Sequence, residues 1–424
     1  MSFALGLLPV LLLVAGFPIY LVLLTSCTVA LMFFMNVPLS VMHQTLFGSI
    51  DAFALLAVPF FIYAGELMGR GSVAQRLVDV VQTGIGRVPG SLGVTTVGTA
   101  AIFGAISGVS AATVATIGRI MVPAMLRQRY PEHFAAGLIT SVGAIDIIIP
   151  PSVPMIVYGV AAQESVPRLY AAGIFPGLLI AVMLALYVMW YARRTGIADG
   201  PRFDSGRFFL ALRRGIWALG APVIILGGIY GGVFSPTEAA AVACVYAALV
   251  TRLVYREVSW REILDAAGST VVFTAQILIV VACASVFAWL LTVNQVPAVL
   301  VRAIEGMQLS PWMILLALNV LLLVVGCFID PLSAILILTP LLVPVITAAG
   351  IHPVHFGIVL TVNLAIGLFH PPFGINIFVA QSVLGLKLPV IYRGILPFLV
   401  LYLIALALIT YIPAISLAGM RLFF

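Results

Sequence analysis

An acidic residue followed by a proline lies in the middle of a long apolar stretch. Residues 311–349 are apolar on both sides of Ile329-Asp330-Pro331, and a later apolar stretch is broken at His370-Pro371-Pro372-Phe373-Gly374. Proline removes a backbone donor and disfavours helix at the preceding residue, so nearby carbonyls lose their helical partners. Inside a lipid bilayer such carbonyls, and a carboxylate, need partners from the protein or from a ligand. The pattern predicts a polar binding site within a membrane; the alternative is two helices kinked by prolines at the bilayer edges.

The first half of the chain carries the same arrangement. Residues 91–126 form two apolar arms around Ser107-Gly108-Val109-Ser110, and the next apolar stretch is broken at Pro150-Pro151-Ser152. Each arm is shorter than the roughly 20 residues that a helix needs to cross a bilayer. The small polar centre therefore predicts the tip of a re-entrant hairpin. A single packing helix rich in small residues is the alternative.

Prolines and glycines repeat between the two halves at one constant shift. The shift that brings Pro123 onto Pro344 also relates Pro150-Pro151 to Pro371-Pro372, Gly173 to Gly394, and Pro176 to Pro397. It superimposes the first tip (107–110) on the second tip (328–331). Paired broken helices in corresponding positions of two repeats are typical of transporter binding sites. The repeat therefore favours a transport function over a purely structural one.

The composition is that of an integral membrane protein. Of 424 residues, 63% are hydrophobic and only 8% are charged, whereas soluble proteins have about 25% charged residues. At roughly 20 residues per spanning helix, the chain can form about a dozen apolar segments. Lys and Arg outnumber Asp and Glu by 20 to 14, but no basic stretch carries interleaved aromatic residues. We therefore expect the lipid bilayer, and not nucleic acid, to be the partner of this charge.

The motifs of enzymes and of ATP-driven pumps are missing from the sequence. It has no Ser/His/Asp set, no His-Glu-x-x-His motif and no paired acids on one helix. It also lacks the G-x-x-x-x-G-K-[ST] loop that holds ATP phosphates. The four cysteines lie in apolar stretches without the spacing of disulfides or metal sites. We expect neither an enzyme nor an ATP-driven pump.

The order of segments predicts an all-α polytopic membrane protein made of two inverted repeats, 1–192 and 215–424, joined by a cytoplasmic linker at 193–214. The first repeat is expected to contain scaffold helices (1–70), an arm (71–90), a hairpin (91–126), a broken helix (133–163) and a helix (169–192). The second is expected to contain scaffold helices (215–292), a hairpin (311–349), a broken helix (353–385) and a helix (390–413). Residues 3–35 form either one kinked helix or two short ones, and 37–50 suit an interfacial helix.

The arginines predict the side of the membrane from which each hairpin opens. Cytoplasmic segments carry an excess of Lys and Arg, and arginines flank the first hairpin and fill the linker. An odd number of crossings separates the two hairpins. The second hairpin is therefore expected to open from the outside, below a loop at 293–311 with few charges.

Both tips combine groups that bind sodium. Na+ is a hard cation that favours oxygen ligands, and helix ends and unwound carbonyls coordinate ions in transporters. Each tip offers side-chain oxygens beside the carbonyls freed by a proline pair. These groups are Ser107 and Ser110 with Pro150 and Pro151 at the first tip, and Asp330, Ser333 and Asn363 with Pro371 and Pro372 at the second. We predict two related sodium sites with the substrate between them.

Two titratable residues near the proline pairs each have two interpretations. Asp146 precedes Pro150 by four residues. It either supports the first site or is a buried acid satisfied by a neighbouring hydroxyl. His370 either titrates near neutrality at the second site or is a packed, hydrogen-bonded histidine.

Five stretches together resemble the large membrane subunit of tripartite ATP-independent periplasmic (TRAP) transporters. They are AGELMGRG (64–71), GAISGVSAATVATIG (104–118), IIIPPSVPMIVYG (147–159), GCFIDPLSAILILTP (326–340) and NLAIGLFHPPFGINIFVA (363–380). The resemblance covers nearly the whole chain. It implies an elevator-type, sodium-coupled importer of organic acids, either carboxylates or sugar acids, in the bacterial inner membrane. Its partners would be a small four-helix membrane subunit and a periplasmic substrate-binding protein.

The resemblance also extends the set of candidate site residues. Carried over to this sequence, the ion-binding regions of the family include Gly108, Gly326 and His370 in addition to the residues named above. To the substrate we assign Asp146, Ser152, Pro372 and Gly374. Two residues depart from the family pattern: Asp146 stands where a small or apolar residue is expected, and His370 where a threonine is frequent. A stand-alone ion-coupled carboxylate transporter of related fold is the alternative function.

Overall fold

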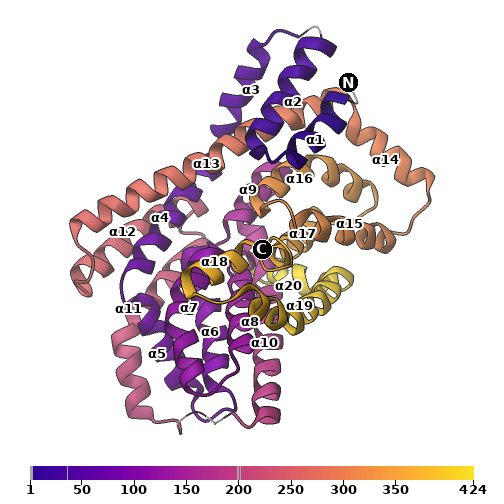
Figure 1. The fold of residues 1–424 in the computed structure, drawn as a ribbon. Helices are drawn as coiled ribbons and strands as arrows, with labels where there is room; N and C mark the ends of the chain where they lie inside the picture. The colour runs from indigo at the N-terminus through magenta and orange to yellow at the C-terminus, as the bar shows by residue number, and fades with distance from the viewer. Residues whose placement is uncertain (1–2, 36, 198–199, 201) are drawn as a thin grey trace.

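The computed structural model describes residues 3–35, 37–197, 200 and 202–424, and these residues form helices and connecting turns without a β-strand. The predicted all-α fold is confirmed. The first half contains η1 (Phe3–Leu7), α1 (Leu8–Val14), α2 (Ile19–Phe34), α3 (Ser40–Ile50), η2 (Phe53–Leu56), α4 (Ala57–Arg70), α5 (Val73–Ile85), α6 (Ser91–Ser107), α7 (Ser110–Arg127), α8 (Glu132–Val142), η3 (Gly143–Ile147), α9 (Val153–Ala162) and α10 (Val166–Thr195). The second half contains α11 (Ser205–Tyr230), α12 (Pro236–Leu249), η4 (Val250–Val254), α13 (Trp260–Val293), α14 (Val296–Gly306), α15 (Pro311–Gly326), α16 (Pro331–Ala348), α17 (Pro353–Gly367), α18 (Ile375–Leu384), α19 (Leu388–Tyr411) and α20 (Pro413–Phe423) (Figure 1).

Both halves contain a helical hairpin followed by a broken helix. The first hairpin is α6–α7 and the second is α15–α16. The first broken helix runs through α8 and η3, unwinds at 148–152 and resumes as α9; the second runs through α17, unwinds at 368–374 and resumes as α18. Both proline pairs, Pro150-Pro151 and Pro371-Pro372, lie in the unwound segments and have a cis peptide bond.

The two halves interlock through equivalent contacts. Helix α7 of the first hairpin packs on α18 of the second broken helix, and α16 of the second hairpin packs on α9 of the first. Helix α8 packs closely against α19 because glycines meet at their crossing: a Cβ on Gly394 would lie 2.9 Å from the backbone nitrogen of Gly137. Each hairpin therefore closes over the broken helix of the other half.

A second group of helices lies beside this interlocked core. The long helix α13 runs obliquely past α2, α3 and α4, and it also contacts α16 of the second hairpin (Figure 1). Helices α4 and α12 pack together, and α11 packs on α5. We call α1–α4 and α11–α14 the scaffold helices, and α5 the arm.

The arm is fastened to the scaffold by a cluster of charged residues. Glu257, between η4 and α13, accepts hydrogen bonds from the backbone nitrogen (2.7 Å) and hydroxyl (2.6 Å) of Ser72, at the start of α5. Arg76 pairs with the same carboxylate at 2.9 Å and lies over the ring of Tyr255. Burial alone would raise the pKa of Glu257, but the bonds from Ser72 and Arg76 outweigh it and lower that pKa.

Several boundaries differ from the sequence-based expectation. The expected loop at 293–311 is wrong, because most of it forms the amphipathic helix α14, which has Pro297 in its first turn and leaves Val299 and Leu300 exposed. The 193–214 linker is shorter than expected: α10 continues to Thr195, and Asp204 caps α11 through the backbone nitrogens of Gly206 and Arg207. Residues 198–199 and 201 of that linker lie outside the described residues. An additional helix, α20, follows the expected last span, and residues 3–35 form two separate helical segments.

Seven helices of the described part are long and apolar enough to cross a membrane. The arms α6 and α15 and the halves of both broken helices are shorter. Short helices of this kind fit segments that end inside the bilayer, where their ends are buried in protein.

Candidate functional site

The first tip is a tight turn that touches the first proline pair. Gly108 adopts the left-handed conformation (φ 59°), which ends α6 and reverses the chain into α7. A Cβ at Gly108 would lie 3.1 Å from the carbonyl oxygen of Pro151. Ser107, Gly108 and Pro151, three of the residues predicted for the first sodium site, therefore lie close together.

A buried carboxylate lies beneath the first tip. Asp146, in η3, is fully buried and accepts hydrogen bonds at Oδ2 from Ser107 Oγ (3.3 Å) and Thr113 Oγ1. Its Oδ1 has no hydrogen-bond partner. The carboxylate rests on Gly104, where a Cβ would lie 2.5 Å from Oδ1. The hydroxyl pairing considered for Asp146 is thus present at one of its two oxygens.

Ser152 bridges the break in the first broken helix. Its hydroxyl donates to the carbonyl oxygen of Ile147 at 2.6 Å and accepts from the backbone nitrogen of Met155 at 3.4 Å. The residue is buried and caps α9. Its side chain therefore joins the two halves of the broken helix.

The second tip presents a capped helix start. Asp330 accepts at Oδ1 from the backbone nitrogens of Leu332 (3.1 Å) and Ser333 (3.0 Å), which caps α16. Gly326, at the end of α15, packs against the broken helix: a Cβ there would lie 3.4 Å from Cα of Gly367. The second tip and its broken helix are therefore in contact, as at the first tip.

Two further predicted ligands of the second site lie around this contact. Asn363 donates from Nδ2 to Asn319 Oδ1 (2.7 Å) and to the Val359 carbonyl (2.9 Å), while its own Oδ1 is buried without a partner. His370 Nδ1 lies 3.1 Å from Cys327 Sγ and also meets the carbonyl oxygen of Pro371. The packed, hydrogen-bonded interpretation of His370 describes these contacts.

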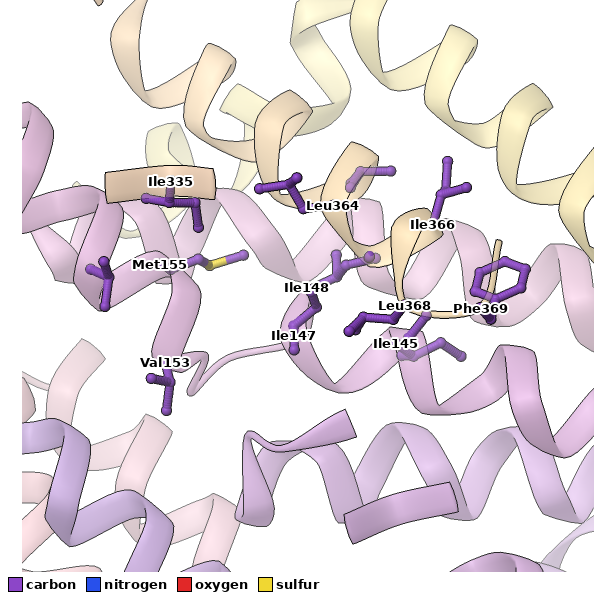
Figure 2. Close-up of a cluster of buried hydrophobic side chains, with 14 of the residues drawn as sticks. Ile145, Ile147, Ile148, Val153, Met155, Ile335, Leu364, Ile366, Leu368 and Phe369 are labelled. Atoms are coloured by element: carbon purple, nitrogen blue, oxygen red, sulfur yellow. The ribbon is translucent and has the colours of Figure 1, made fainter. Parts of the chain in front are cut away.

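Apolar side chains hold the two breaks against each other. Figure 2 shows residues from the two breaks and from the neighbouring helices in one buried cluster; it includes Ile145, Ile147, Ile148, Val153, Met155, Ile335, Leu364, Ile366, Leu368 and Phe369. Inside a membrane such side chains hold helices together by van der Waals packing. The polar groups at the tips are therefore set on a closely packed apolar base.

A cavity of about 480 Å³ lies between the two tips. One wall comes from the hairpins and broken helices, through 108–111, 330–333, Leu368, Ile375 and Asn376. The other wall comes from the scaffold, through 18–20 at the start of α2 and through Phe273, Gln276 and Ile277 of α13. None of the lining residues, all in the described part of the chain, is Lys, Arg or His.

Four helices begin at this cavity. The first residues of α7 (Ser110), α9 (Val153), α16 (Pro331) and α18 (Ile375) all line it. A helix N-terminus carries a partial positive charge, which attracts anions. The start of α16 is already capped by the carboxylate of Asp330 and that of α9 by Ser152, whereas the starts of α7 and α18 have no side-chain cap. Because these two uncapped starts converge from both halves, they favour an anion in the cavity although no cationic side chain lines it.

The predicted site residues divide into two groups in the structure. Gly108, Ser110, Asp330 and Ser333 line the cavity. The four residues assigned to the substrate do not line it: they are Asp146, Ser152, Pro372 and Gly374. The carbonyl of Pro372 instead accepts a hydrogen bond from Tyr392 at 3.0 Å.

Sequence reasoning missed two amide side chains on opposite walls, Asn376 and Gln276. Both are polar residues inside apolar stretches, a signal that was available in the sequence. What it does not contain is the tertiary placement that puts them on one cavity.

Two interlocked repeats, with hairpin tips and broken helices around a central cavity, define a membrane transporter. This is the architecture in which substrate and ion sites lie between repeats. The profile of the family described as "Tripartite ATP-independent periplasmic transporter, DctM component" matches residues 5–415. The chain belongs to this family, so it is a large permease subunit of the bacterial inner membrane and not an enzyme.

Named relatives cover most of the chain. It is 40% identical over 406 residues to the "Isethionate TRAP transporter permease protein DctMQ" of Oleidesulfovibrio alaskensis, covering 96% of this chain and 64% of the relative. This chain thus spans less than two thirds of that relative's length. It is 41% identical over 373 residues to the "C4-dicarboxylate TRAP transporter large permease protein DctM" of Pseudomonas aeruginosa, covering 88% and 87%.

A solved structure shares the fold. The crystal structure of the YdaH transporter of Alcanivorax borkumensis superposes with a TM-score of 0.65 and covers 95% of this chain and 98% of that one. The two sequences are 15% identical. The likeness therefore concerns the fold alone.

Proposed function

We propose that this permease subunit uses a sodium gradient to import an organic acid. The convergence of the uncapped starts of α7 and α18 on one cavity carries the proposal, because that geometry favours an anion. Two relatives support the substrate class by their names: isethionate is a sulfonate, and C4-dicarboxylates carry two carboxylates. Both are small organic anions.

Sodium ions at the two tips would neutralise this anion. Na+ is transported with the acid and needs oxygen ligands. At the second tip, the side-chain Oδ1 of Asn363 is buried and receives no hydrogen bond. Asn363 lies on α17, which contacts the end of α15: a Cβ at Gly326 would lie 3.8 Å from the backbone carbonyl oxygen of Asn363. An acceptor without a donor is costly in a buried place, and a cation would satisfy it. The oxygens of the first tip and its proline pair form the corresponding site.

An elevator motion would carry this site across the membrane. The cavity lies between the interlocked hairpin core and a scaffold wall built from α2 and α13. A substrate held mainly by hairpin tips can move with the core while the scaffold stays in place. The arm, which joins scaffold to core between α4 and α6, is the connection that such a motion requires.

The import would need two partners. A small four-helix membrane subunit would join the scaffold helices, and a periplasmic binding protein would deliver the acid. The names of both relatives favour this tripartite arrangement over the stand-alone transporter. The missing phosphate-loop motif agrees with an ion gradient as the energy source.

Uptake into vesicles tests this function. The chain and its small subunit are reconstituted, and the binding protein is supplied loaded with the radiolabelled form of the acid that co-purifies with it. We expect accumulation under an inward Na+ gradient with no ATP present. Equal accumulation with K+ in place of Na+ would refute the sodium coupling, and a requirement for ATP would refute the mechanism.

A further inference from the structure

Asp146 is the one fully buried Asp, Glu, Lys or Arg among the residues that the structure describes. It precedes the first proline pair as Gly367 precedes the second. The packing is also equivalent, because Asp146 rests on Gly104 of the first hairpin and Gly367 rests on Gly326 of the second. The two halves therefore have the same contact, but only the first places a carboxylate in it.

The surroundings leave this carboxylate half satisfied. Ser107 and Thr113 donate to Oδ2, whereas Oδ1 has no partner. No ion pair found among the described residues involves Asp146. A carboxyl group removed from water either takes up a proton or pairs with a positive charge. A bound cation would supply that charge to this cluster.

The groups in contact with Asp146 and with the first tip are those that a small cation uses. The hydroxyl of Ser107 touches the carboxylate, and the next residue, Gly108, lies against the carbonyl oxygen of Pro151. All are oxygens, the ligand type of hard cations. A cation bound here would be held by one hairpin and one broken helix, so it would fasten the first tip.

We propose that Asp146 is a carboxylate ligand of the first-tip sodium ion, which gives that site a buried negative charge that the second repeat lacks at Gly367. The inference rests on the sodium coupling proposed above. The first site then binds Na+ more tightly than an uncharged set of oxygens does. The competing view is that Asp146 only accepts hydrogen bonds from Ser107 and Thr113.

Sodium titrations of the purified protein distinguish the two views. A ligand that binds only the folded state raises the unfolding temperature. The unfolding temperature is therefore measured at increasing Na+ concentrations, with K+ making up the difference so that the ionic strength stays constant. The variants are Asp146→Asn, which keeps shape and one acceptor oxygen, and Asp146→Gly, which copies the second repeat. Asp79→Asn, on the exposed face of the arm, is the control for losing a negative charge.

We expect both Asp146 variants to need about tenfold or more Na+ for the half-maximal shift, by analogy with breaking a buried ion pair. Asp79→Asn should match the unmodified protein. An Asp146→Asn titration that superimposes on that of the unmodified protein would overturn the inference. So would the failure of both variants to fold in buffer without Na+, because the proposal leaves the carboxylate uncompensated there and its removal should not unfold the protein. If the unmodified protein itself does not respond to Na+, the proposed sodium coupling fails instead.

Discussion

Ser110 and Asn376 hydrogen-bond to each other across the cavity wall. Ser110 Oγ lies 3.0 Å from Asn376 Oδ1 and 2.9 Å from Asn376 Nδ2, and that amide also donates to the carbonyl oxygen of Thr140 at 3.1 Å. Ser110 begins α7 of the first hairpin, and Asn376 lies at the start of α18 in the second broken helix. The pair therefore ties the two repeats together at the site itself.

Replacing Asn376 by Ala should weaken both the fold and transport. The change leaves Ser110 and the Thr140 carbonyl buried without this partner, at a cost of about 1–3 kcal/mol. We expect a lower unfolding temperature together with reduced uptake. Gln276→Ala removes an amide from the scaffold wall and should leave the unfolding temperature unchanged. Equal unfolding temperatures for the two variants would show that the Ser110–Asn376 link carries no stability.

Gly65 is where the scaffold touches the first tip. A Cβ at Gly65, in α4, would lie 2.8 Å from Cα of Ser107, whereas one at Gly69 would meet nothing closer than 3.9 Å. Gly65→Ala therefore forces two backbones apart, at about 1–3 kcal/mol by analogy with overpacked cores. We expect slower uptake for Gly65→Ala and nearly normal uptake for the matched control Gly69→Ala. The same rate in both variants would exclude a functional contact at Gly65.

Glu257 should hold the arm in a pH-dependent way. Because its pKa in the folded protein lies below the ordinary value of 4.5, its contribution is present above that pH and is lost as the pH falls through the folded-state pKa. Glu257→Gln should increase hydrogen exchange at the start of α5 at pH 7. We expect the free energy of opening there to fall by less than about 1 kcal/mol, because the ion pair is partly exposed to solvent. Once the pH lies below the folded-state pKa of Glu257, the two proteins should exchange alike.

A matched variant controls for the loss of charge in that experiment. Glu66 pairs with Arg70 inside α4, one turn away in the same helix. Glu66→Gln should leave exchange at the start of α5 unchanged. If it loosens α5 as much as Glu257→Gln does, the Glu257 cluster does not fasten the arm.

Proline positions made much of the fold predictable. The constant shift that relates Pro150-Pro151 to Pro371-Pro372 located both hairpins and both breaks, because proline acts on its own backbone wherever it lies. The helix α14 was missed, since this stretch with few charges between two apolar segments was interpreted as a loop. The cavity was not predictable in detail. Ser152 was assigned to the substrate but caps α9. The hydrogen bonds between Asn376 and Ser110 depend on how the two halves pack together, and no local sequence pattern contains that information.

Asp330 should matter for its charge as well as its cap. Its carboxylate caps α16 and also lines the cavity. Asn caps a helix about as well as Asp, so Asp330→Asn isolates the charge. We expect the variant to fold and to need about thirtyfold to several-hundredfold more Na+ for half-maximal uptake, from a loss of about 2–4 kcal/mol. An unchanged sodium dependence would leave Asp330 as a helix cap alone.

Sodium entry measured together with acid entry tests the central claim most directly. Vesicles containing this chain and its small subunit receive radioactive Na+ and the loaded binding protein, with the initial rates of both solutes recorded. The account predicts that Na+ enters only when the loaded binding protein is present, with more than one Na+ for each acid. Acid entry without accompanying Na+, or Na+ entry that ignores the acid, would contradict it.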